Sequence, residues 1–110
     1  MTTPEKKVKD KVKKILTEHG VYYFMPATGG FGKSGVPDIV ACVQGVFYGI
    51  ECKAGKGKPT ALQEKNLMEI MKQGGVAILI NENGLEEFKL FMEAGVPDKG
   101  MFIDLLKEKK

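Results

Sequence analysis

The feature that most constrains the fold is a pair of β-prone runs separated by only two residues. The runs span 38–43 and 46–53, and Gln44-Gly45 lies between them. Glycine tolerates the positive φ that a two-residue hairpin turn requires, so this spacing predicts an antiparallel hairpin. If the residues that flank the turn pair with each other, Asp38 lies directly opposite Glu51.

This register predicts a charged face on the hairpin. Opposed carboxylates repel, so a ladder that holds Asp38 and Glu51 together needs a cation between them. Lys53 shares their face because residues two apart on a strand point the same way, whereas Cys52 points to the other side. Two carboxylates and an ammonium suit phosphodiester hydrolysis, since hard oxygen ligands bind Mg²⁺ or Mn²⁺ and Lys53 can offset phosphoryl charge. A solvated hairpin face is the alternative, and a bulge at the turn would break the register.

The remaining pattern predicts helices around a sheet. Apolar residues at helical spacing indicate an amphipathic helix that begins at Thr2 or Thr3 and ends at Gly20, with a Thr2-x-x-Glu5 capping box and Glu5 on the buried stripe. The other expected elements are a strand over 21–25, a helix from Thr60 to 74–75 with a Thr60-x-x-Gln63 capping box, a buried strand over 76–80, a helix from Asn83 to Gly95 and a helical tail over 101–106. The order α-β-β-β-α-β-α predicts one α/β domain over residues 1–110, with a mixed β-sheet flanked by helices.

The amino-acid composition restricts the classes of binding partner that we expect. The chain has 17 Lys, no Arg and 14 acidic residues, which gives a net charge of +3. The Lys residues cluster at both ends and over 53–58, as is typical of a protein with a polyanionic partner. No apolar run approaches the ~20 residues that span a bilayer, and no signal-peptide segment opens the chain, so we expect a cytoplasmic protein without a membrane partner. Cys42 and Cys52 are expected to be buried thiols.

Residues 27–34 form a permissive match to a nucleotide-binding phosphate loop. Such a loop must open a helix at its Lys-Ser pair, here Lys33-Ser34, because the helix N-terminus binds the phosphate. Gly35 and Pro37 follow at once and prevent that helix. We therefore expect no nucleotide cofactor.

Three segments together resemble a known nuclease family. Gly35-Val36-Pro37-Asp38, then Glu51-Cys52-Lys53 thirteen residues after the Asp, then Thr60-Ala61-Leu62-Gln63, are similar to the VRR-NUC branch of the PD-(D/E)xK nucleases. The resemblance implies a restriction-endonuclease-like fold and metal-dependent DNA cleavage.

The resemblance also implies roles for individual residues. Asp38, Glu51 and the backbone carbonyl of Cys52 would be ligands of Mg²⁺ or Mn²⁺, and Lys53 would be the catalytic base-like or charge-stabilising group. Gln63 would match a helix-borne Gln near the site, although its capping box alone could explain it. Glu5 would match a first-helix Glu that completes the metal site, or it serves only the helix dipole and cap.

Minimal members of this family resemble Holliday junction resolvases, which implies a homodimer that cuts branched DNA, either Holliday junctions or flaps. The phosphate contacts expected in that case are Lys33, Ser34, Lys56 and Lys58. Because the chain has no Arg for bidentate contacts to guanine, recognition of DNA shape is favoured over recognition of sequence. The alternative is a non-catalytic DNA-binding module that uses the Lys clusters.

Overall fold

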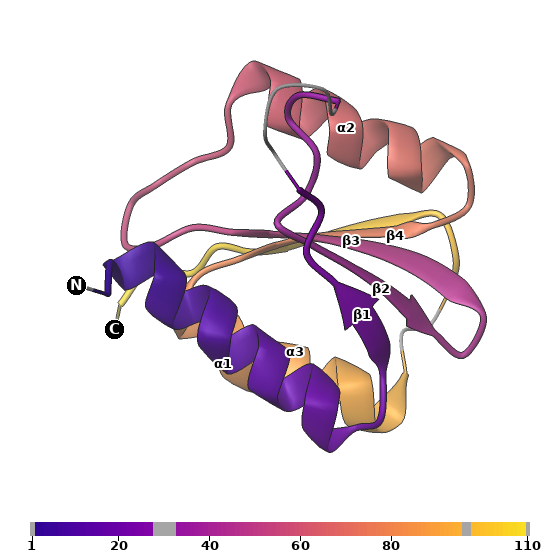
Figure 1. Ribbon diagram of the computed structural model, residues 1–110, viewed down its shortest axis with the longest axis horizontal. Helices are drawn as coiled ribbons and strands as arrows, with labels where there is room; N and C mark the ends of the chain where they lie inside the picture. Colours follow the sequence, from indigo (N-terminus) through magenta and orange to yellow (C-terminus); the bar gives the residue numbers. More distant parts are fainter. Residues whose placement is uncertain (1, 28–32, 96–97, 110) are drawn as a thin grey trace.

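The computed structural model describes residues 2–27, 33–95 and 98–109 (Figure 1). Its elements, in chain order, are α1 (Pro4–Glu18), β1 (Tyr22–Phe24), β2 (Ile39–Val43), β3 (Val46–Cys52), α2 (Ala61–Lys72), β4 (Val76–Ile80), a 3₁₀ turn η1 (Glu82–Gly84), α3 (Leu85–Ala94) and β5 (Met101–Leu105). The predicted fold class, a mixed sheet flanked by helices, is confirmed.

The five strands form one sheet in the order β1-β2-β3-β4-β5. The first three strands are antiparallel neighbours, whereas β3, β4 and β5 run parallel. The carboxyl ends of the parallel strands therefore meet at one edge, where Cys52, Ile80 and Leu105 lie in register. This edge positions the candidate site.

Helices cover the sheet on both faces (Figure 1). One face carries α1 and α3, and the larger core lies under them; its helical members include Val8, Val12 and Phe88. The other face carries α2, where Leu67 packs with Ala77 and Leu79. All five residues of β4 are buried, as expected for a strand with helices on both sides.

The N-terminal caps differ in how well the sequence predicts them. The capping box of α2 is confirmed: the Thr60 hydroxyl accepts from the Gln63 amide, and the Gln63 side chain accepts from the Thr60 amide. The Thr2-x-x-Glu5 box is wrong, because Thr3 is the N-cap of α1 and accepts from the amide of Lys6. Either Thr satisfies the capping pattern, and the actual start places Lys6 three residues after the cap. Glu5 is thereby free of a capping role.

The C-terminal segment corrects the prediction of a helical tail. Residues 101–105 form β5, the edge strand that pairs in parallel with β4. Ile103 and Leu105 pack into the core under α1 and α3, while Phe102 and Leu106 pack on the opposite side under α2. This alternation has the period of a strand, and five residues are too few to reveal it without the partner strand.

Within the described ranges, no helix is long and apolar enough to cross a membrane.

Candidate active site

The hairpin between β2 and β3 has the predicted register. Val43 pairs with Val46, and Ile39 pairs with Ile50. Gln44 and Gly45 have φ values of 50° and 83°, which fits a two-residue turn with positive φ at both central positions. Asp38 directly precedes Ile39, and Glu51 directly follows Ile50. The two carboxylate residues therefore lie next to this pair, at the edge of the sheet where β3 ends.

The Gly35-Val36-Pro37 segment sets the approach of the chain to Asp38. Gly35 has a φ of +75°, and a Cβ there would lie 2.6 Å from Cγ of Leu62 on α2. Pro37 is buried against Gly49 of β3, where a Cβ would lie 2.9 Å from the proline ring. Both glycines are needed for close packing, so the motif fixes where Asp38 enters the sheet.

Three carboxylates converge at this edge. Glu5 from the first turn of α1, Asp38 and Glu51 each bring one oxygen within 4.8 Å of the others. Glu51 is buried, with 1% of its surface exposed, whereas Glu5 and Asp38 are partly exposed. A buried member and two accessible members form a cluster that is open to solvent on one side.

Two lysines stand beside these carboxylates. Lys53 Nζ lies 3.5 Å from Glu51 Oε2 and 3.9 Å from Glu5 Oε1. Lys9 Nζ lies 3.4 Å from Asp38 Oδ1. Burial lowers the pKa of Lys9, but the carboxylates of Asp38 and Glu5 more than offset this and leave that pKa above its usual value. Sequence reasoning missed Lys9, although its position one helical turn after Glu5 places it on the same face of α1.

Glu51 is the unusual member of the cluster. Its Oε1 is buried and has no hydrogen-bond partner within the described part of the chain. Burial, together with the Asp38 charge, raises the pKa of Glu51 from about 4.5 to about 8 even though Lys53 lowers it. A buried acceptor without a partner is unfavourable, so the site fits an additional cation. Three carboxylates supply the hard oxygen ligands that Mg²⁺ and Mn²⁺ prefer.

Asp38 is held by a backbone group. Its Oδ2 accepts from the Cys52 amide at 2.9 Å. The Cys52 side chain is buried in the core under α1 and α3, where burial raises the pKa of its thiol well above the usual range. The thiol is therefore inert, and a ligand role for Cys52 rests on its backbone carbonyl and stays a prediction. Cys42, expected to be buried, is exposed because α2 does not cover β2.

The other predicted site residues lie outside the carboxylate cluster. Gln63 is engaged in the α2 capping box, and a catalytic role for it stays a prediction. Lys33 pairs with Glu69 of α2 at 3.1 Å, and the Ser34 carbonyl accepts from Asn66. The remaining two predicted phosphate contacts, Lys56 and Lys58, are exposed on the loop that follows Lys53.

The phosphate-loop motif falls largely on residues 28–32, which lie outside the described ranges. The Lys33-Ser34 pair of the motif and the residues up to Asp38 form a turn and irregular chain and open no helix.

A mixed sheet that brings an Asp, a Glu and a Glu-x-Lys lysine together at one edge defines a PD-(D/E)xK-type nuclease. The family model of the archaeal Holliday junction resolvases (Hjc) matches residues 5–94, and the chain belongs to this family. No curated protein and no solved structure gives a significant match. The family implies nuclease activity on Holliday junctions, and all three carboxylates and both lysines lie within the matched residues. The narrower VRR-NUC resemblance stays a prediction.

Proposed function

We propose that this chain is a divalent-metal-dependent endonuclease that hydrolyses phosphodiester bonds in branched DNA, with the Holliday junction as its preferred substrate. The observation that carries the proposal is the buried Oε1 of Glu51, which has no partner among the described residues and belongs to a cluster of three carboxylates. A buried, unpaired carboxylate oxygen beside two other carboxylates is typical of a site that binds a cation. The family match supplies the substrate class.

Asp38, Glu51 and Glu5, with the Cys52 carbonyl, would hold Mg²⁺ or Mn²⁺. When bound, such an ion supplies Lewis acidity toward a phosphoryl oxygen and lowers the pKa of water. Asp38 contributes an oxygen whose orientation is set from both sides, by the Cys52 amide and by Lys9. Because this orientation is fixed, the site would bind the ion without rearrangement of the Asp38 side chain.

Lys53 supplies the fixed positive charge. Its ammonium is held between Glu51 and Glu5, with only 13% of the side chain exposed. In this position it can donate hydrogen bonds to a phosphate oxygen and offset the negative charge that develops during hydrolysis. The low solvent exposure strengthens this interaction relative to that of a surface lysine.

Phosphate contacts outside the cluster are proposed for Lys33, Ser34, Lys56 and Lys58. Lys33 and Glu69 are both largely exposed, and such a surface pair is worth only about 0 to 1 kcal/mol, so DNA can replace it. Contacts of this kind position the DNA backbone without reading bases.

A homodimer is the proposed assembly. Tyr22 and Phe24 of β1 and Phe47 of β3 expose half or more of their surfaces, and β2 lies between these two strands. Because α2 packs over β3, β4 and β5, this apolar face lies toward the β1 side of the sheet, with Phe47 at its border with α2. An exposed apolar face of this kind suits a self-complementary contact. A two-fold dimer would place two sites on a four-way junction, which itself has two-fold symmetry. Sedimentation of the wild type and of a Phe24→Ser variant tests this assembly, and a monomeric wild type would contradict it.

The test of the function is cleavage of labelled four-way junction, flap and linear duplex DNA in Mg²⁺ or Mn²⁺, comparing the wild type with Glu51→Ala. Cleavage of the junction by the wild type alone is the expected result. Preference for the flap would replace the resolvase proposal with a flap nuclease. Tight binding of DNA without cleavage would overturn the catalytic proposal in favour of a non-catalytic DNA-binding module.

A further inference from the structure

Lys9 is the more exposed of the two lysines beside the carboxylate cluster. Its Nζ lies 3.4 Å from Asp38 Oδ1, and 35% of its side chain is exposed. Lys53 contacts Glu51 and Glu5 instead, and only 13% of its side chain is exposed. The two lysines therefore reach the cluster from different elements, Lys9 from α1 and Lys53 from the residue after β3, and they contact different carboxylates.

The Lys9 ammonium has donors that Asp38 alone does not use. An ammonium carries three N–H donors, and among the described residues Asp38 is the one carboxylate within ion-pair distance of it. The partly exposed members of the cluster are Glu5 and Asp38, so the side that is open to solvent is the side on which Lys9 stands. A phosphate that approaches Asp38 from solvent therefore comes within reach of Lys9.

The packing of α1 keeps Lys9 in this place. Lys9 follows Glu5 by four residues, so the two side chains are neighbours on one face of the helix. Val8 and Val12, on either side of Lys9 in the chain, are buried in the larger core. The helix therefore presents Glu5 and Lys9 to the cluster from a backbone that is fixed by the core.

The net charge of the site favours a role for a second lysine. The three carboxylates carry three negative charges, and the ammonium groups of Lys9 and Lys53 carry two positive charges. With a divalent ion bound the net charge would be +1, which one phosphodiester neutralises, because each DNA phosphate carries one negative charge. Without Lys9 the same site would be neutral, and the charge of the phosphate would stay uncompensated in a partly buried place.

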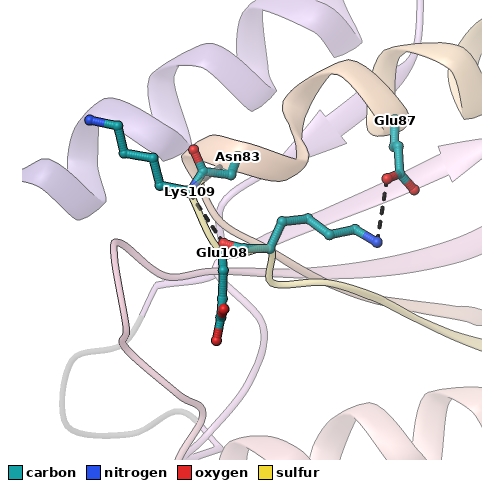
Figure 2. Close-up of a pocket in the computed structure, with 5 residues that line it drawn as sticks. Asn83, Glu87, Glu108 and Lys109 are labelled. Atoms are coloured by element: carbon teal, nitrogen blue, oxygen red, sulfur yellow. Dashed lines mark hydrogen bonds and ion pairs between the residues drawn. The ribbon is translucent and has the colours of Figure 1, made fainter.

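A lysine near this edge of the sheet does not serve the cluster merely by being there. Lys107 follows β5, but its Nζ lies 3.3 Å from Glu87 of α3, and Figure 2 shows this ion pair at Glu87. The ion pairs of the described residues that involve a carboxylate of the cluster come from Lys9 and Lys53.

We propose that Lys9 is a phosphate-binding residue of the active site, whose ammonium donates to a non-bridging oxygen of the phosphodiester that is cut while it stays beside Asp38. This inference rests on the proposed function and gives Lys9 a contact with the substrate in addition to its contact with Asp38. Lys9 acts from the Asp38 side of the cluster, and Lys53 acts from the side of Glu51 and Glu5.

Binding and cleavage of a four-way junction by Lys9→Gln test this proposal. Binding is measured by fluorescence anisotropy at several salt concentrations, with Ca²⁺ in place of Mg²⁺ to limit cleavage. Loss of one phosphate contact should lower the slope of log affinity against log salt by about 0.9. Single-turnover cleavage in Mg²⁺ should fall by about a hundredfold or more, because a donor to the reacting group is gone. Lys9→Arg, which keeps the charge, should retain the slope.

The matched control is Lys11→Gln. Lys11 is exposed on the same helix, but it lies two residues on and therefore about 200° around the helix axis from Lys9. This variant loses the same charge, and it should keep the wild-type slope and the wild-type cleavage rate.

A role limited to holding Asp38 gives a different result. In that case Lys9→Gln would keep the wild-type salt slope and would lose the rise of the thermal unfolding midpoint in Mn²⁺, whereas a phosphate contact predicts a lower slope and a retained rise. An unchanged slope in Lys9→Gln, or an equal loss in Lys11→Gln, overturns the inference, while cleavage by the wild type leaves the proposed function standing. A wild type that binds the junction without cleaving it overturns the proposed function, and this inference with it.

Discussion

Two buried polar side chains lie at the same edge of the sheet, and they have opposite surroundings. Glu51 near the end of β3 and Asn81 directly after β4 are each 1% exposed. Asn81 has partners for both its amide and its oxygen, since it binds backbone groups of Gly55, Asn83 and Lys107. Glu51 has one oxygen near Lys53 and another without a partner among the described residues.

The difference in hydrogen bonding separates a structural role, for Asn81, from a proposed functional role, for Glu51. A buried polar group with every hydrogen bond made stabilises the chain segments that it joins. A buried carboxylate with an unmet acceptor destabilises the folded state unless a ligand is present. Asn81 thus has the surroundings of a structural residue, and Glu51 has those expected of a ligand in the proposed metal site. The four predictions below test this distinction, from the largest expected effect to the smallest.

Replacing Glu51 with Gln should separate activity from stability most clearly. Mutation of residues that only orient metal ligands already lowers activity by about 10 to 100-fold, so loss of a ligand should lower junction cleavage by more than about a hundredfold. Above pH 8, where the Glu51 carboxyl of the metal-free wild type is charged, the variant should unfold at the same or a higher temperature, because Gln stays neutral. Glu93→Gln, on the exposed side of α3, is the control and should leave both unchanged. A variant that cleaves at the wild-type rate would exclude Glu51 from the site.

Replacing Asn81 with Ala should mainly lower the stability of the fold. We expect the free energy of unfolding, measured by urea denaturation, to fall by about 3 kcal/mol, because several buried backbone groups lose their partner. Asn83→Ala is the matched control: the Asn83 side chain donates one exposed hydrogen bond to Lys107, and its loss should cost less than about 1 kcal/mol. Equal losses in the two variants would contradict the structural role of Asn81.

Addition of Mn²⁺ should raise the thermal unfolding midpoint of the wild type. At a concentration of 100 times the dissociation constant, binding to the native state alone adds about 2.7 kcal/mol, which corresponds to roughly 10 °C or more for a domain of this size. Asp38→Asn should lose this shift, while Asn81→Ala should retain it from a lower starting midpoint. A shift that survives in Asp38→Asn would place the ion elsewhere.

The pH dependence of stability should distinguish Glu51 from ordinary carboxylates. Its pKa is raised to about 8 in the folded protein, from about 4.5, so the folded state binds a proton more tightly. This contribution is complete below pH 4.5 and is lost as the pH rises through 8. In the presence of a chelator, the wild type should therefore lose about 1 kcal/mol or more relative to Glu51→Gln between pH 5 and pH 8.5. If the two midpoints run parallel across this range, the Glu51 carboxylate is not perturbed.

The sequence predicted the local parts of this site well. The Gln44-Gly45 turn has strong local preferences, so the β2–β3 register, and with it the approach of Asp38 to Glu51, followed from residues close together in the chain. The Thr60-x-x-Gln63 box is equally local and is confirmed. The choice between Thr2 and Thr3 was not resolved by local pattern, because both residues fit the N-cap.

Only the tertiary structure decided the rest, because it depends on contacts between distant segments. The five residues of β5, four of them apolar, become a strand because β4 offers them a free parallel edge, which no local pattern reveals. Lys9 reaches Asp38, and Asn81 reaches Lys107, only after α1 and β5 have packed at the carboxyl end of the sheet. The sequence by itself determined which carboxylates face each other across the hairpin. The packing decided that Glu51 is buried with an oxygen that has no hydrogen-bond partner among the described residues, because burial is a property of the assembled layers and not of any one segment.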